Sequence, residues 1–167
     1  MRHALLPLVL LGSVVASAQN PPAPAAARTT SNRGFDAVLK QVESAQVLLV
    51  NGQPAAFKAL WSQEDDVTLS GGLGGVIAKG WAQVSARLDW VATQYRDGTR
   101  THEEISRYVG PDVAYVVLRE TIRFKSPVDG HAMTQELRVT QVFRLRDGRW
   151  RIVHRHADSQ TTKTTTG

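Results

Sequence analysis

The chain divides into a part whose hydrophobic residues recur at helical spacing and a part in which they alternate with polar residues. The helical spacing predicts helices at residues 36–50, shortly after Pro54, and at 80–96. The alternation predicts strands at residues 66–70, 101–109, 113–125, 133–146 and 150–157. Helices followed by an antiparallel meander are typical of an α+β domain with its helices on one sheet face. Such an arrangement leaves a tapering cavity, the usual place for a ligand.

The two ends of the chain carry neither pattern. Residues 1–18 combine a short basic start, an apolar run and an Ala-Ser-Ala site, which predicts a signal peptide. Residues 19–33 are rich in Pro and Ala and predict a flexible linker, and residues 159–167 predict a disordered polar tail. The folded domain is therefore expected at residues 34–158. We expect it to be exported, periplasmic or secreted, with no membrane contact after the signal is cleaved.

Polar side chains interrupt the apolar rows of three successive predicted strands. Residues i and i+2 of a strand share a face, so Glu120 and Gln141 each fall in an otherwise apolar row. In the last strand, His154 and His156 align with Trp150. Burying each polar group separately is costly unless it finds a partner. We therefore predict that these groups converge on one ligand pocket, with a buried hydrogen-bond network that holds no ligand as the alternative.

The predicted pocket gives each residue a role. A carboxylate beside an imidazole in a partly apolar site is suited to acid/base chemistry. The candidate catalytic residues are therefore Glu120, His154 and His156. The candidate ligand-binding residues are Trp61, Trp90 and Tyr95 from the helix layer, with Gln141 and Asp158 from the sheet.

Other chemistries find little support in the sequence. His154 and His156 could chelate a metal, but no third histidine is well placed and the chain has no cysteine, so we expect no metal and no cofactor. Residues 71–75 are glycine-rich but lack the Lys-Ser/Thr of a phosphate-binding loop, and no Gly-x-Ser-x-Gly elbow occurs. The net charge of +5 is spread over outward strand positions, which indicates a solvated basic face and no nucleic-acid partner.

The stretch from Leu137 to Asp158, LRVTQVFRLRDGRWRIVHRHAD, resembles the closing hairpin of SnoaL-like proteins of the nuclear transport factor 2-like superfamily. Residues 57–69, 79–81 and 110–120 support the match, and the hairpin is similar to the subgroup related to the calmodulin-dependent kinase II association domain. The resemblance implies a cone-shaped, curved antiparallel sheet wrapped on three N-terminal helices. It also implies a homodimer packed through the outer sheet face, in a fold that hosts isomerases, cyclases, hydrolases and non-catalytic binders.

The resemblance also bears on the ligand. In the kinase association domain the pocket carries arginines on two adjacent strands, and this chain has Glu120 and Gln141 at the corresponding positions. That difference argues against an anionic ligand and favours a polar neutral or cationic one. We therefore expect an exported domain that binds a small, partly apolar molecule in its cone, and isomerase-, cyclase- or hydrolase-like acid/base activity stays open. The alternative is a non-catalytic homodimerisation or interaction domain.

Overall fold

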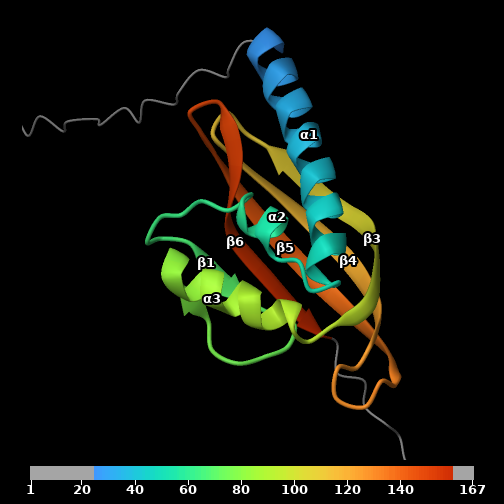
Figure 1. Ribbon diagram of the computed structural model, residues 1–167. Coiled ribbons are helices and arrows are strands. Elements are labelled where there is room, and N and C mark those ends of the chain that lie inside the picture. The colour runs from blue at the N-terminus through green and yellow to red at the C-terminus, as the bar shows by residue number, and fades with distance from the viewer. Residues whose placement is uncertain (1–24, 160–167) are drawn as a thin grey trace, which may run out of the picture.

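The computed structural model describes residues 25–159, in which three helices cover one curved six-stranded sheet (Figure 1). The helices are α1 (Ala25–Leu49), α2 (Ala55–Lys58) and α3 (Trp81–Ala92). The strands are β1 (Thr68–Ser70), β2 (Ala78–Lys79), β3 (Arg96–Val109), β4 (Val113–Lys125), β5 (Ala132–Arg146) and β6 (Arg149–Ser159). Their order in the sheet is β2-β1-β6-β5-β4-β3; β1 pairs with β6 in parallel, and the other neighbours pair antiparallel. The predicted α+β class is confirmed.

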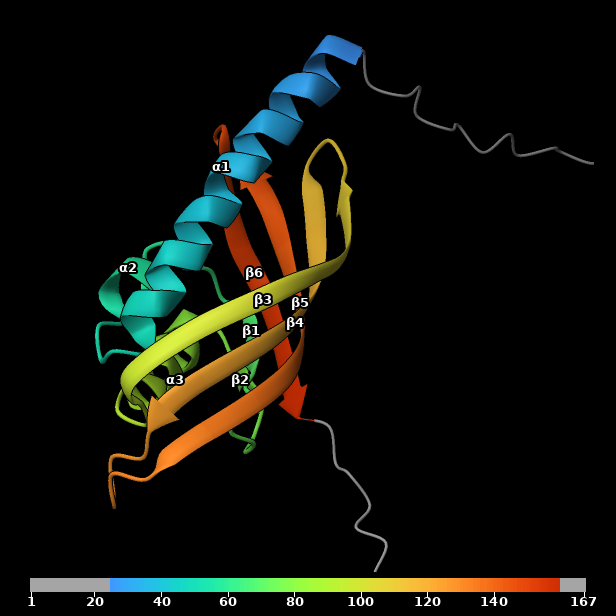
Figure 2. The same ribbon diagram turned by 90° about the vertical axis from the view of Figure 1, so that its right-hand side faces the viewer.

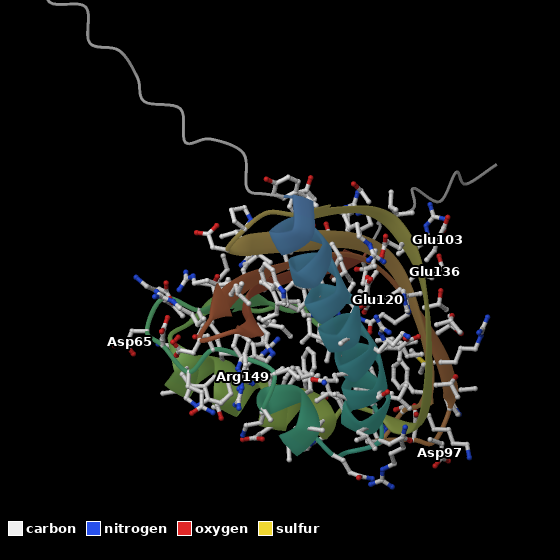
Figure 3. The ribbon with its side chains drawn as sticks, turned by 90° about the horizontal axis from the view of Figure 1, so that it is seen from above. Asp65, Asp97, Glu103, Glu120, Glu136 and Arg149 are labelled. Carbon is white, nitrogen blue, oxygen red and sulfur yellow. The ribbon has the colours of Figure 1, made fainter. Side chains whose placement is uncertain are left out.

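Helix α1 lies on the concave side of the sheet, which curls around it (Figures 2 and 3). The helix contacts β3 and β6, whereas α3 contacts β1 and β2. The buried side chains of α1 recur every three or four residues, so one stripe of the helix faces the sheet. They are Phe35, Val38, Val42, Ala45, Gln46 and Leu49. Gln46 is the polar member of this otherwise apolar stripe.

The start of α1 differs from the sequence prediction. The helix begins at Ala25 rather than at Asp36, so the last part of the predicted linker, residues 19–33, is helical. Residues 1–24 and 160–167 lie outside the described residues, and so do the predicted signal peptide and most of the predicted tail. Within the described part of the chain, no helix combines the length and the apolar character that a membrane span requires.

Strand β3 also begins earlier than predicted, at Arg96 rather than Thr101. The Asp97-Gly98 pair forms an irregularity in the β3–β4 ladder, with Asp97 at φ 50°. Asn51, just after α1, holds this point: its Oδ1 accepts from Gly98 N at 3.0 Å and its Nδ2 donates to Gly98 O at 2.8 Å. The longer strand places Arg100 opposite Ile122 on the inner sheet face.

A β-bulge in β6 changes which side chains face the core. Val142 of β5 pairs with His154, but the next residue, Phe143, pairs with Ile152. Val153 is therefore an extra residue in β6, and the alternation of inward and outward positions reverses there. The sequence prediction assumed an unbroken alternation through this strand.

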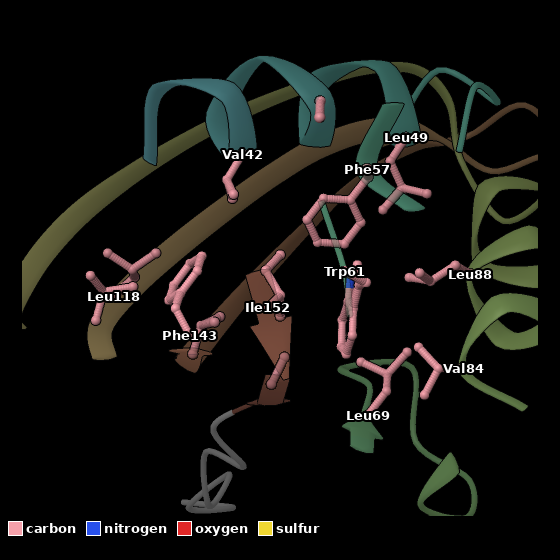
Figure 4. Packing of buried hydrophobic residues seen from close by; sticks show 14 of the residues in the cluster. Val42, Leu49, Phe57, Trp61, Leu69, Val84, Leu88, Leu118, Phe143 and Ile152 are labelled. Carbon is pink, nitrogen blue, oxygen red and sulfur yellow. The ribbon is translucent and has the colours of Figure 1, made fainter. Parts of the chain in front are cut away.

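The hydrophobic core lies between the sheet and the three helices (Figure 4). Trp61 is 2% exposed and packs edge-to-face against Phe57 of α2. Leu69 of β1 and Val84 and Leu88 of α3 belong to the same cluster. The cluster continues under α1, where Phe35 packs edge-to-face against Phe143 of β5.

Candidate functional site

A cavity of about 360 Å³ lies between α1 and the inner face of β3, β4 and β5. Its apolar lining consists of Leu39 and Val42 from the helix and Val116 and Leu118 from β4. This volume falls within the range of small-molecule sites, about 300–1,000 Å³. The remaining lining is polar, and it divides into an inner end, a wall and a mouth.

At the inner end, three buried polar side chains each carry at least one atom without a hydrogen-bond partner among residues 25–159. Gln141 of β5 is 0% exposed, and both its Oε1 and its Nε2 are unpartnered. Gln46 of α1 is 3% exposed with a free Oε1, and Arg100 of β3 has a free Nε. All three residues line the cavity. Buried polar groups are normally satisfied, so such a cluster indicates that something else completes it.

Directly behind this end lies a buried ion-pair cluster. Glu120 of β4 is 0% exposed and sits on the sheet side that faces α1 (Figure 3). Its Oε1 accepts from Arg100 at 2.6 Å and its Oε2 accepts from Arg155 at 2.7 Å. Burial alone would raise the pKa of Glu120, but Arg155 and Arg100 outweigh it and hold the pKa at about 2. Glu120 is therefore a permanent carboxylate near neutral pH, and the predicted acid/base role is corrected to that of a counter-ion.

The cavity wall carries a histidine that the sequence prediction did not include. His102 of β3 pairs in register with Glu120. Its Nδ1 lies 3.3 Å from Arg100 Nη1, a donor, and 3.7 Å from Glu43 Oε1, an acceptor on α1. With the ring proton on Nδ1, that proton is on the side of Glu43 and Nε2 keeps a free lone pair; with the proton on Nε2, the ring is a donor there. The side chain is 28% exposed and lines the cavity, so it is suited to proton transfer.

The mouth of the cavity is closed on one side by an ion-pair network. Arg107 of β3 donates from Nη1 to Asp36 Oδ1 at 2.5 Å and from Nε to Glu104 Oε1 at 2.7 Å. Because Asp36 belongs to α1, this arginine ties the helix to β3. Hydrogen bonding to Glu104 raises the pKa of Arg107, with a smaller effect of Asp36 in the same direction.

Three of the predicted ligand-binding residues lie away from the cavity. Trp61 belongs to the hydrophobic core. Trp90 is 41% exposed on α3, and the Arg87 guanidinium lies 4.1 Å above its ring. Tyr95 is buried, its hydroxyl donates to Gln135 Oε1 at 3.0 Å, and burial raises its pKa to about 12. Neither predicted tryptophan lines the cavity, because Trp61 packs in the core and Trp90 lies on the surface.

The bulge at Val153 moves the predicted residues of β6 to the outer sheet face. His154 Nδ1 contacts Thr68 Oγ1 of β1 at 2.8 Å, and burial, with a smaller effect of His156, lowers the pKa of His154. His156 is exposed, and Asp158 pairs with Arg138 at 2.7 Å. The prediction that His154 and His156 meet Glu120 in one pocket is therefore wrong.

In their place the bulge turns Arg155 inward, opposite Gln141. The residues 25–159 contain no group of three His, Asp or Glu side chains placed to hold a metal ion. Of the predicted site residues, Gln141 lines the cavity and Glu120 lies behind it.

The sequence prediction left out three residues that line the cavity: Arg100, His102 and Gln46. The predicted third helix ran to residue 96 and the predicted strand began at 101, so Arg100 fell in a loop. Had the strand been started at 96, alternation would have placed Arg100, His102 and Glu104 on one face. The signal for Gln46 was stronger, because it lies on the apolar stripe of α1 together with Val42 and Leu49.

Comparisons with known proteins agree with this architecture. Residues 42–160 match the family model described as SnoaL-like domain. A candidate dehydratase of the NTF2-like family from Streptomyces avermitilis is 17% identical with a TM-score of 0.67, covering 80% of this chain and 99% of that one. A type 2 hexachlorocyclohexane dehydrochlorinase is 15% identical with a TM-score of 0.65, covering 83% and 94%.

A candidate calcium/calmodulin-dependent protein kinase II association domain from Xanthomonas campestris is 20% identical with a TM-score of 0.57, covering 77% of this chain and 86% of that one. At these identities the similarity shows the fold alone. No curated protein matches the sequence. The SnoaL-like family predicted from the closing hairpin is confirmed.

Proposed function

The chain belongs to the SnoaL-like domain family, and on that premise we propose that it binds a small, partly apolar molecule in the cavity under α1 and acts on it by proton transfer at His102. The observation that carries the proposal is the inner end of the cavity, where Gln46, Arg100 and Gln141 are buried with unpartnered polar atoms. A ligand with a hydrogen-bonding group and an apolar body would satisfy those atoms and pack against Leu39 and Leu118.

His102 is the residue best placed for the chemistry. It is partly exposed to the cavity, and the Glu43 carboxylate of the opposite wall lies 3.7 Å from its Nδ1. Two structural neighbours bear the names of elimination enzymes, a candidate dehydratase and a dehydrochlorinase. An imidazole that takes a proton from carbon is the group such a reaction, or an isomerisation, needs. Glu120 supports the site by holding Arg100 at the inner end of the cavity.

The binding part is tested by filling the cavity. Leu39→Trp introduces a large side chain from a half-buried lining position, and Leu48→Trp places the same side chain on an exposed position of α1 as the control. Saturation-transfer NMR with a panel of cyclic ketones, alcohols, amides and carboxylic acids should show binders for the wild type and Leu48→Trp, and lose them in Leu39→Trp. A panel without any binder to the wild type would contradict the proposal.

The catalytic part is tested by proton exchange. The full chain should accelerate deuterium incorporation next to the carbonyl of 2-indanone in D2O, followed by NMR. His102→Asn should lower that rate by about a hundredfold, the usual contribution of a general base. His156→Asn, on the outer face, is the matched control and should keep the wild-type rate. Equal rates for the two variants would remove His102 from the proposed mechanism.

A second candidate function is a non-catalytic domain that dimerises through its outer sheet face. The observation that favours it is a pair of stacked tyrosines there, Tyr108 of β3 and Tyr115 of β4, whose ring centroids lie 5.8 Å apart. Both rings are substantially exposed, and Val113 beside them is exposed as well. An aromatic surface of this kind is typical of protein interfaces.

A further inference from the structure

We propose that the cavity recognises its ligand through a neutral primary carboxamide, or a group with the same two donors and two acceptors, held by Gln46, Arg100 and Gln141. The inference rests on the proposed function, because it names the ligand class of the same cavity.

The unpartnered atoms at the inner end of the cavity determine which hydrogen-bond donors and acceptors a ligand must carry there. Two of them are donors, Gln141 Nε2 and Arg100 Nε, and two are acceptors, Gln141 Oε1 and Gln46 Oε1. A primary carboxamide has an oxygen that accepts two hydrogen bonds and an NH2 group that donates two. Its oxygen can meet Gln141 Nε2 and Arg100 Nε, while its nitrogen meets the two glutamine oxygens. The four unpartnered atoms and the four hydrogen bonds of such a group therefore match in number and in kind.

Ionised groups match the same atoms poorly. A carboxylate has only acceptors, so it would leave the oxygens of Gln46 and Gln141 facing oxygen. An ammonium group has only donors, so it would leave Gln141 Nε2 and Arg100 Nε unmet. A buried hydrogen-bonding group left without a partner costs its full desolvation energy. The atom pattern therefore selects against both kinds of ion.

The charges around the cavity give an independent argument for a neutral ligand. The acids that line the cavity or lie behind it are Asp36, Glu43, Glu104 and Glu120. The bases are Lys40, Arg100, Arg107 and Arg155. The two sets are equal in number, and the guanidinium nitrogens of Arg100 and Arg155 that contact Glu120 are already engaged. The cavity therefore has no net charge that would attract an anion or a cation. Arg155 faces inward, but its charge is balanced by Glu120.

Three probes of the same size separate the ligand classes: benzamide, benzoate and benzylamine, which is a cation near neutral pH. Calorimetric titration of the full chain should show that benzamide binds at least about tenfold more tightly than the other two, because each ion leaves buried atoms unsatisfied.

Two matched variants identify the recognition group. Gln141→Met keeps the side-chain volume and removes both amide atoms, so benzamide affinity should fall at least about tenfold while the unfolding midpoint stays the same or rises. Gln135 lies in the same inward row of β5 but is fully engaged, since its Nε2 donates to Gly72 O at 3.0 Å and its Oε1 accepts from Tyr95. Gln135→Met should therefore lower the unfolding midpoint and keep the affinity for benzamide.

Tighter binding of benzoate, equal binding of all three probes, or unchanged benzamide affinity in Gln141→Met would overturn the inference and leave cavity binding intact. A large loss of stability in Gln141→Met would also overturn it, because it would show that the glutamine is structural. Absence of any binder in the whole NMR panel is a different result, which overturns the proposed function itself.

Discussion

Glu120 illustrates how neighbours decide the role of a single carboxyl group. Its position in an apolar row is that of a raised-pKa acid, yet two arginines contact it and the pKa lies at about 2. One of them, Arg100, comes from β3, and the other, Arg155, is brought in by the bulge in β6. The sequence placed both arginines outside the pocket, so the environment of Glu120 could not be predicted from its own strand.

The ion-pair cluster makes stability depend on pH in one direction. The folded-state pKa of Glu120 lies below its ordinary value of 4.5, so the unfolded state binds the proton more readily. The contribution to stability is therefore complete above pH about 4.5 and is lost as the pH falls towards 2. Urea unfolding of the wild type across this range should show the loss. A Glu120→Gln variant, which cannot titrate here, should show a smaller slope.

The same variant should be costly at neutral pH. Removing the carboxylate leaves two largely buried guanidinium groups without their counter-ion, so Glu120→Gln should lower the free energy of unfolding by about 3–5 kcal/mol. Glu103→Gln is the control, because Glu103 forms an exposed pair with Arg119 and should cost under about 1 kcal/mol. Similar losses in both variants would show that the buried cluster is no more important than a surface pair.

At the level of elements, the hydrophobic pattern predicts the helices and long strands well and their interruptions poorly. Alternation gives the inward rows of β4 and β5 correctly, because the pairing of these two strands is unbroken. It fails in β6, where one extra residue reverses the faces. No local signal marked the bulge, because adjacent apolar residues like Ile152 and Val153 also occur where the pairing is unbroken, as at Val116 and Val117 of β4. This error affected the predicted site most. His154 and His156 lie on the outer sheet face, and Arg155 lies on the inner face in their place.

The junction between α1 and β3 offers a test at this scale. A Cβ on Gly98 would lie 2.3 Å from Val50 O, a backbone atom that cannot move away easily. Gly98→Ala should therefore lower the free energy of unfolding by about 2–3 kcal/mol, in the range of overpacking. Gly71→Ala is the matched control, because its Cβ would meet only the Arg87 side chain at 3.9 Å. A neutral Gly98→Ala would contradict the tight contact between helix and strand.

The two faces of the curved sheet differ in what we expect them to bind. The concave face holds the cavity, and the convex face exposes the Tyr108–Tyr115 stack. We expect a dimer through the convex face in sedimentation equilibrium at micromolar concentration, and Tyr115→Glu should convert it to a monomer because a charge would be buried at the interface. Arg149→Glu, at the exposed β5–β6 turn, is the control and should leave the dimer intact. A monomeric wild type would remove the second candidate function.

The place of β6 in the sheet has a consequence for how the domain is made. This strand follows the other five in the sequence, yet it lies between β5 and β1. Its partner residues in β1 are more than eighty positions earlier, as in the Thr68–His154 contact. Until β6 leaves the ribosome, β1 and β2 lack the ladder that attaches them to the rest of the sheet. Long-range pairings of this kind are slow to close. The β2–β1 pair can therefore join the sheet only after β6 has paired with β5, so this edge closes after the β3–β4–β5 meander.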